Sequence, residues 1–138
     1  MTVTEADKTV ANALQVQLGS QVIKLERLRL ADKVPMAVEC SYLNYDLCKG
    51  IFDYDLSNVS LYHTLENQLG LELRKGSQYM EAVLMDAKQA SLLEVPVGSV
   101  ALSIERHIAS GDGTTLEVVY SIYRGDLFRF YIELDGNR

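Results

Sequence analysis

Residues 13–27, ALQVQLGSQVIKLER, align without a gap on residues 92–106, LLEVPVGSVALSIER. The identical dipeptides are Gly19-Ser20 with Gly98-Ser99 and Glu26-Arg27 with Glu105-Arg106. One deletion later, Glu39 falls on Glu117 and Tyr42 on Tyr120. Shared Gly and Leu positions also arise from α/β patterning alone, but the ungapped Gly-Ser and Glu-Arg matches favour a true duplication. Two copies are too few for a solenoid, so they predict one sheet built from two related halves that enclose a cleft.

The order of elements read outward from this repeat predicts an α+β fold with an antiparallel sheet and flanking helices. Thr4 is the expected N-cap of a first helix that Gly19 ends, and residues 44–58 are expected to be irregular. A second helix is predicted from Leu61 to Gln68, capped by Ser57 or Ser60, and a third from Asp86 to Leu92. The predicted strands are Gln21–Leu30, Pro35–Leu43, Gln78–Met85, Val100–Ile108, Thr115–Tyr123 and Phe128–Glu133.

Length and composition indicate one globular domain. The chain has 138 residues, 48% of them hydrophobic and 23% charged, and no apolar run approaches the ~20 residues of a membrane span. The first residues lack the features of a signal peptide, so we expect a cytoplasmic protein. Two cysteines and two histidines without ligand spacing predict no metal site, and no motif for another cofactor is present. Cys40 is expected to be buried and Cys48 to lie in a loop.

The net charge of −6 argues against direct binding to nucleic acid, because such binding rests on Lys and Arg neutralising phosphates. Any DNA contact is therefore expected to come from another segment.

Arg27 and Arg29 lie two residues apart on a predicted strand, so their side chains share one face about 6–7 Å apart. Ile23 and Leu25 share that face, which is apolar at one end and cationic at the other. Two guanidinium groups at this spacing can converge on a phosphate or carboxylate. The alternative is a solvated strand face with ordinary arginines.

Glu39 and Glu117 occupy equivalent positions in the two halves. Two carboxylates across a cleft can act in acid/base catalysis or accept hydrogen bonds from sugar hydroxyls. The more common alternative is structural pairing, here with Arg27 and Arg106.

Three further residues are candidates for ligand contact. Ser60 and Tyr62 begin a predicted helix, where free N–H groups and a hydroxyl can meet an anion, although Ser60 also fits a plain N-cap. Tyr123 is suited either to stacking on a ligand or to packing in the core.

Three stretches of the chain resemble the UTRA domain, the ligand-binding module of GntR-type regulators of the HutC subfamily. The stretches are LERLRLADKVPMAVECSYL (25–43), SLYHTLENQLGL (60–71) and LEVVYSIYRGDLFRFYIEL (116–134). Their motifs, R-x-R, P-x-x-x-E, S-L-Y and E-x-x-x-S-x-Y-R-x-D, are weak singly and fairly specific in this order. The resemblance covers about residues 4–135 and identifies the whole chain, 1–138, as one effector-binding and dimerisation domain.

The resemblance implies a chorismate-lyase-like fold and a cleft that binds an anionic effector such as a phosphorylated sugar. It assigns the phosphate to Arg27, Arg29, Ser60 and Tyr62, the sugar to Glu39 and Glu117, and an aromatic contact to Tyr123. It further implies a homodimeric transcription repressor, not an enzyme, that contacts DNA only through an N-terminal winged helix-turn-helix outside this sequence. The family's usual first strand is also expected to be cut. The alternatives are a lyase acting on a carboxylated ring such as chorismate, and a dimerisation module without a ligand.

Overall fold

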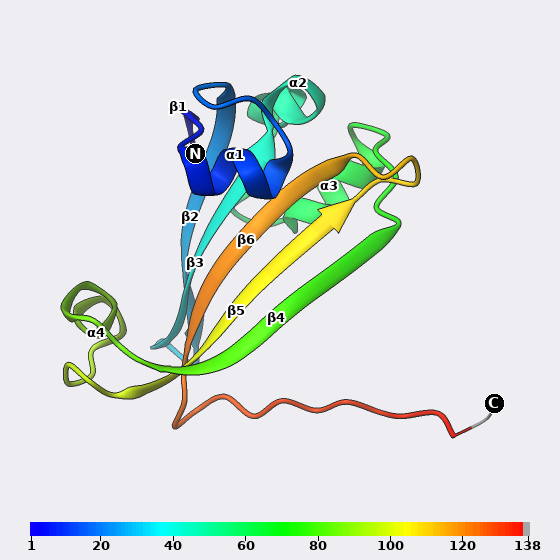
Figure 1. Ribbon diagram of the computed structural model, residues 1–138. Coiled ribbons are helices and arrows are strands. Elements are labelled where there is room, and N and C mark those ends of the chain that lie inside the picture. Colours follow the sequence, from blue (N-terminus) through cyan, green and yellow to red (C-terminus); the bar gives the residue numbers. More distant parts are fainter. Residues whose placement is uncertain (137–138) are drawn as a thin grey trace.

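A computed structural model describes residues 1–136 of the chain as one six-stranded antiparallel sheet with short helices (Figure 1). The strand order is β1-β2-β3-β6-β5-β4, and the predicted α+β class is confirmed. The elements are β1 Thr2–Glu5, α1 Lys8–Leu14, β2 Gln21–Ala31, β3 Val34–Asn44, α2 Tyr45–Cys48, the 3-10 helix η1 Lys49–Asp53, α3 Leu61–Asn67, β4 Lys75–Leu84, α4 Ala87–Leu93, β5 Val100–Ala109 and β6 Thr115–Arg124.

The backbone repeats itself as the sequence does. Asp7 caps α1 through the amide of Val10, and Asp86, 79 residues later, caps α4 through the amide of Gln89. Both helices end on a residue in the left-handed conformation, with φ of 58° at Gln15 and 59° at Glu94. Because the helix caps and the helix ends recur at the same offset, and the next two strands of each half pair antiparallel, the structure supports the predicted duplication.

The two halves meet at the centre of the sheet, where β3 pairs with β6. Glu39 lies opposite Ser121 and Glu117 lies opposite Leu43, so the pair of Ser41 and Val119 lies midway between the two glutamates. A local two-fold axis through this central pair would therefore exchange Glu39 and Glu117. The duplication thus sets two carboxylates on one face, at equal distances from the middle of the sheet.

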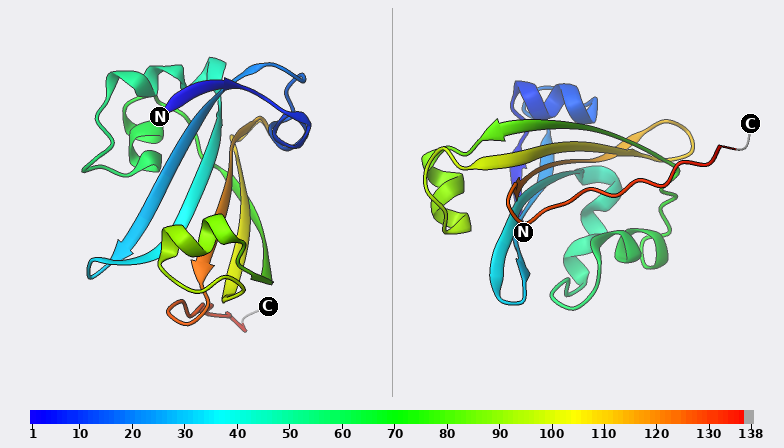
Figure 2. Two further views of the ribbon diagram at one scale, coloured as in Figure 1. Left: turned by 90° about the vertical axis from the view of Figure 1, so that its left-hand side faces the viewer. Right: turned by 90° about the horizontal axis from the view of Figure 1, so that it is seen from below.

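Different helices cover the two faces of the sheet (Figure 2). The helices α1 and α4 pack on one face, against Val22 with Val118 and against Ala101 respectively. The opposite face receives α2, η1 and α3, whose apolar side chains pack on Ile23, Leu25 and Leu43. These short helices cover only one end of that face, and the remainder is left for polar side chains.

The N-terminal segment differs from the prediction. Residues Thr2–Glu5 form a strand that pairs with β2, whereas the sequence predicted a helix capped by Thr4. Asp7 is the cap, and α1 ends at Leu14 rather than at Gly19. A short strand therefore stands at this edge of the sheet, where we expected the first strand to be missing.

The C-terminal segment also differs from the prediction. Residues Phe128–Glu133 were expected to form a strand, but they lie in none and run as an extended segment away from the end of β6 (Figure 1). The chain turns at Gly125, whose amide donates to the carbonyl of Val100, and leaves the sheet there. An alternating apolar pattern needs a partner strand, and the segment has none within residues 1–136.

Residues 44–58, expected to be irregular, contain two short helices, α2 and η1. The environments of the two cysteines are therefore the reverse of those predicted. Cys48 lies on α2 and is fully buried, whereas Cys40 is half-buried on the sheet. Among the described residues, no helix is long and apolar enough to cross a membrane.

Candidate functional site

A cleft of about 580 Å³ lies on the face of the sheet that α2, η1 and α3 leave partly uncovered. Its floor is formed by β2, β3, β5 and β6, and its wall by the segment from Leu56 to Tyr62. The structure places all seven candidate site residues in its lining, namely Arg27, Arg29, Glu39, Ser60, Tyr62, Glu117 and Tyr123.

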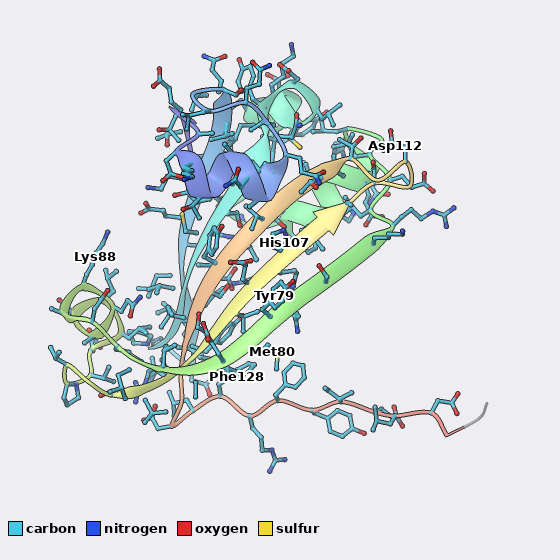
Figure 3. All side chains as sticks on the ribbon, viewed as in Figure 1. Tyr79, Met80, Lys88, His107, Asp112 and Phe128 are labelled. Atoms are coloured by element: carbon cyan, nitrogen blue, oxygen red, sulfur yellow. The ribbon has the colours of Figure 1, made fainter. Side chains whose placement is uncertain are left out.

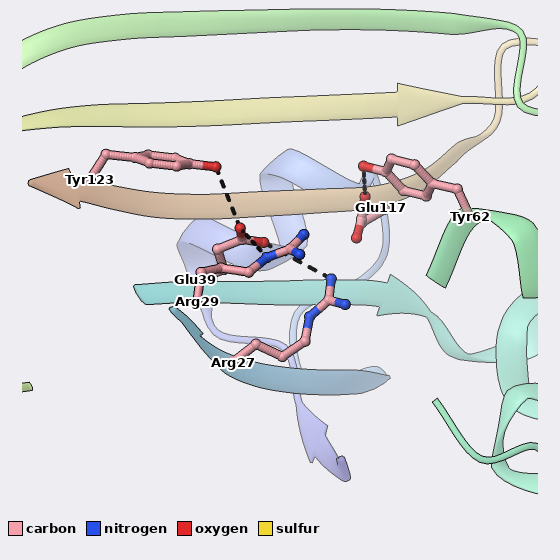
Figure 4. A network of polar contacts seen from close by, with 6 residues as sticks. All are labelled: Arg27, Arg29, Glu39, Tyr62, Glu117 and Tyr123. Carbon is pink, nitrogen blue, oxygen red and sulfur yellow. Dashed lines mark hydrogen bonds and ion pairs between the residues drawn. The ribbon is translucent and has the colours of Figure 1, made fainter. Parts of the chain in front are cut away.

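One end of the cleft is organised around the carboxylate of Glu39 (Figure 4). Nε of Arg29 donates a hydrogen bond to Oε1 at 2.9 Å, and the hydroxyl of Tyr123 lies 3.4 Å from the same oxygen. A terminal nitrogen of Arg27 lies 3.9 Å from Oε2, at the limit of an ion pair. Glu39 therefore holds Arg29 firmly and Arg27 weakly.

Arg27 is less well paired within the protein than Arg29. Its Nε is buried and has no hydrogen-bond partner among the described residues. A buried donor left without a partner costs about 1–3 kcal/mol, which makes this nitrogen a candidate donor to a ligand.

The other end of the cleft is built around Glu117, whose side chain is almost completely buried. The hydroxyl of Tyr62 donates to Oε1 of Glu117 at 2.7 Å (Figure 4). Burial raises the pKa of Glu117, while the hydrogen bond from Tyr62 and the positive charges of Arg27 and Arg106 oppose the rise. Burial, followed by the negative charge of Glu117, also raises the pKa of Tyr62, so its hydroxyl keeps its proton and remains a donor.

The charges of the lining do not cancel. Three arginines and two glutamates line the cleft, which leaves one net positive charge when both glutamates are ionised. An anion supplies the missing charge at the least cost when it binds beside the arginines. Ionised carboxylates are hydrogen-bond acceptors only, so Glu39 and Glu117 are suited to neutral donors such as hydroxyl groups rather than to a second anion.

Ser60 has the structural role that the sequence left open. Its Oγ accepts a hydrogen bond from the amide of His63 at 3.0 Å, which makes it the N-cap of α3. The residue lines the cleft as well, and its hydroxyl proton can still be donated to a ligand.

Arg106 belongs to the cleft, although the sequence suggested only a pairing role for it. It lies on β5, and its Nε donates to Gln78 on the neighbouring strand β4 at 3.1 Å. The repeat carried the signal, because Arg106 is the counterpart of Arg27 in the second half and faces the same side of the sheet.

The rest of the described surface holds no metal site and one other large depression. Within residues 1–136, no group of three His, Cys, Asp or Glu side chains is placed to hold a metal ion. A second depression, of about 620 Å³, lies on the opposite face, and its lining includes Lys24, Tyr42 and Lys88.

Comparison with known proteins identifies the family. The sequence profile of the UTRA domain matches residues 1–129. The HTH-type transcriptional repressor NagR of Bacillus subtilis is 29% identical over 84% of this chain, and the repressor PhnF of Mycolicibacterium smegmatis is 28% identical over 91%. These matches cover 47% and 51% of the two relatives, so the chain spans about half of their length.

Solved structures agree with this relationship. The effector domain of PhnF from Mycobacterium smegmatis superposes with a TM-score of 0.89 at 25% sequence identity. The match covers 98% of this chain and 83% of the PhnF chain. A GntR-family regulator from Enterococcus faecalis V583 has a TM-score of 0.87 at 27% identity, and the match covers 96% of this chain and 95% of the regulator's chain. The profile match, the sequence relatives and the shared fold lead to one conclusion: this chain belongs to the UTRA domain family.

Proposed function

We propose that this chain is the effector-sensing domain of a GntR-type transcription repressor and that its cleft binds a phosphorylated sugar. The observation that carries the proposal is the excess of three arginines over two buried carboxylates in one cleft, together with the unpartnered Nε of Arg27 among the described residues. A phosphate group and a ring of hydroxyls need these two kinds of partner in one pocket.

The phosphate belongs at the arginine end of the cleft. Arg27 and Arg29 project from one face of β2, and both retain donors that Glu39 does not use. Glu39 and Glu117 are acceptors for sugar hydroxyls, and the ring of Tyr123 supplies an apolar surface for the sugar. The volume of about 580 Å³ falls within the range of small-molecule pockets.

Sensing requires the effector to favour one arrangement of the whole regulator over another. A ligand with equal affinity for both arrangements shifts nothing, however tightly it binds. We propose that the domain works as a cytoplasmic homodimer and that an N-terminal winged helix-turn-helix carries the DNA contacts. The net charge of −6 fits this division, because the domain itself repels DNA.

Calorimetric titration of the purified chain tests the proposal. A panel of hexose 6-phosphates, the matching free hexoses and inorganic phosphate should divide into binders and weak binders. At least one sugar phosphate is expected to bind more tightly than both its free sugar and phosphate alone. Failure of every anionic sugar in the panel, with the domain folded, would count against the proposal.

The cleft is proposed to bind without catalysis. Incubation with chorismate, followed by an assay for pyruvate, is expected to show no turnover above the uncatalysed rate. Release of pyruvate that disappears in Glu117→Gln would instead indicate a lyase.

A further inference from the structure

The sequence Tyr-Arg-Gly-Asp at residues 123–126 contains two charged residues that lie outside the described lining of the cleft. Successive strand residues face opposite sides of a sheet, and Tyr123 lines the cleft, so Arg124 points to the other face. Nε and Nη2 of Arg124 donate to the two carboxylate oxygens of Asp126 at 3.1 and 2.7 Å. This two-point contact joins residues only two apart, so it fixes the backbone where β6 ends.

Three backbone hydrogen bonds turn the chain at the same point. The amide of Gly125 donates to the carbonyl of Val100 at 2.9 Å. The amides of Leu127 and Phe128 both donate to the carbonyl of Arg124, at 3.3 and 3.0 Å. A Cβ at residue 125 would lie 2.8 Å from the carbonyl oxygen of Val100, so this close approach requires glycine.

The turn brings the chain back to Tyr123. A fully extended chain would carry residue 128 about 16 Å from residue 123. Instead, the ring centroid of Phe128 lies 4.4 Å from that of Tyr123, with the two ring planes tilted by 39°. Figure 3 shows Phe128 beside the end of β6, where the chain leaves the sheet. Because Phe128 is outside the described lining of the cleft, it acts on a bound ligand only through Tyr123.

Tyr123 extends from this support into the cleft. Its hydroxyl lies 3.4 Å from the oxygen of Glu39 that accepts the hydrogen bond from Arg29 (Figure 4). A hydrogen bond of this length holds the phenol weakly, so the packing of Phe128 decides where the ring lies. Burial, followed by the negative charge of Glu39, raises the pKa of Tyr123, and its hydroxyl therefore keeps its proton.

We propose that residues Arg124, Gly125 and Asp126 form a positioning turn, which holds Phe128 against Tyr123 and thereby fixes the phenol ring as the aromatic contact for the sugar. This role rests on the proposed function and deepens it, because it assigns the sugar, and not the phosphate, to a supported aromatic ring. A ring that is already immobilised loses less side-chain freedom when a ligand binds, which increases affinity.

Calorimetry with a hexose 6-phosphate, the free hexose and inorganic phosphate tests this role. Phe128→Ala is expected to weaken the binding of both sugars about threefold to tenfold and to leave the affinity for inorganic phosphate unchanged. Phe128→Tyr keeps an aromatic ring and should restore the affinity for both sugars. The matched control is Phe130→Ala, which removes the next aromatic ring, 6.4 Å from Phe128, and should change none of the three affinities.

A second variant tests the turn and leaves every aromatic ring in place. Asp126→Ala removes the two hydrogen bonds from Arg124 and should weaken the two sugars in the same pattern as Phe128→Ala, but less strongly. Glu133→Ala removes an equal charge from an exposed residue beyond the turn and should have no effect. Asp126 is exposed, so this variant tests the same role even where Phe128→Ala does not fold.

A second measurement needs no effector. Nuclear magnetic resonance of the chain with isotope-labelled tyrosine follows the ionisation of Tyr123 directly. Because burial is the main cause of the raised pKa of Tyr123, Phe128→Ala should lower that pKa, and Phe130→Ala should not. An unchanged pKa of Tyr123 in Phe128→Ala, or equal weakening of inorganic phosphate and both sugars, would overturn the positioning role. If the parent binds no sugar phosphate but the pKa of Tyr123 falls as expected, the proposed function fails and the support of Tyr123 by Phe128 stands.

Discussion

Replacing Arg27 by alanine separates ligand binding from folding. Among the described residues, this side chain has one ion pair, the 3.9 Å contact to Glu39, and its buried Nε has no hydrogen bond. Its loss should therefore cost the fold less than about 1 kcal/mol, a shift of less than about 5 °C in the melting temperature.

The effect on binding should be larger. A hydrogen bond to a charged group contributes about 1.5–3 kcal/mol, which corresponds to about a tenfold to a hundredfold change in affinity. Arg27→Ala should weaken the binding of a hexose 6-phosphate by this amount and leave the affinity for the free hexose almost unchanged. Calorimetry with both ligands measures the ratio directly.

The matched control is Arg74→Ala, which removes an equal charge from an exposed ion pair with Glu72 outside the cleft. It should alter neither affinity. If Arg27→Ala instead lowered the melting temperature strongly and left the ratio of the two affinities unchanged, the arginine would be a structural partner of Glu39. Arg27 would then not be the phosphate-binding residue.

The Glu117 end of the cleft and the negative charge of the domain give further measurable outcomes. Glu117→Gln should weaken the binding of the phosphorylated sugar and of the free sugar alike. The substitution replaces a group that only accepts hydrogen bonds by an amide that both donates and accepts them. Burial raises the pKa of Glu117 in the folded state, so the native protein loses stability as pH rises through that pKa. Denaturant unfolding between pH 4 and 8 measures the free energy of unfolding of both proteins. The stability of Glu117→Gln relative to the parent should increase as pH rises. A difference that stays constant with pH would contradict this. Tyr62→Phe removes the 2.7 Å hydrogen bond to Glu117 and should cost about 1–3 kcal/mol of unfolding free energy, and an unchanged value would show that water replaces the hydroxyl. In gel-shift assays at physiological salt, the chain alone should retard no DNA duplex specifically. Tight, sequence-dependent retardation would contradict the proposal that a separate domain carries the DNA contacts.

The repeat made much of this fold predictable from sequence. The aligned Gly-Ser and Glu-Arg dipeptides placed two helix–strand–strand halves correctly, and period-two alternation put Ile23 and Leu25 on the face that carries Arg27 and Arg29. Local patterns are sufficient for such features, because each depends on residues close together in the chain. Arg106 was also within reach, as the counterpart of Arg27 in the second half.

What the sequence could not decide depends on distant partners. The strand pattern of Phe128–Glu133 is real, but pairing needs an edge, and within residues 1–136 no strand accepts it. The first residues became a strand because β2 supplied a free edge, which overrode Thr4 as a helix cap. Similarly, the preference of Glu39 for Arg29 over Arg27 is a matter of about one ångström, which no spacing rule resolves.

A crystal structure of the chain with a bound hexose 6-phosphate would show where the phosphate binds. We expect the phosphate within hydrogen-bond distance of Arg27 and Arg29, with sugar hydroxyls on Glu39 and Glu117. A phosphate bound instead in the depression on the opposite face of the sheet, with the cleft left to solvent, would contradict it.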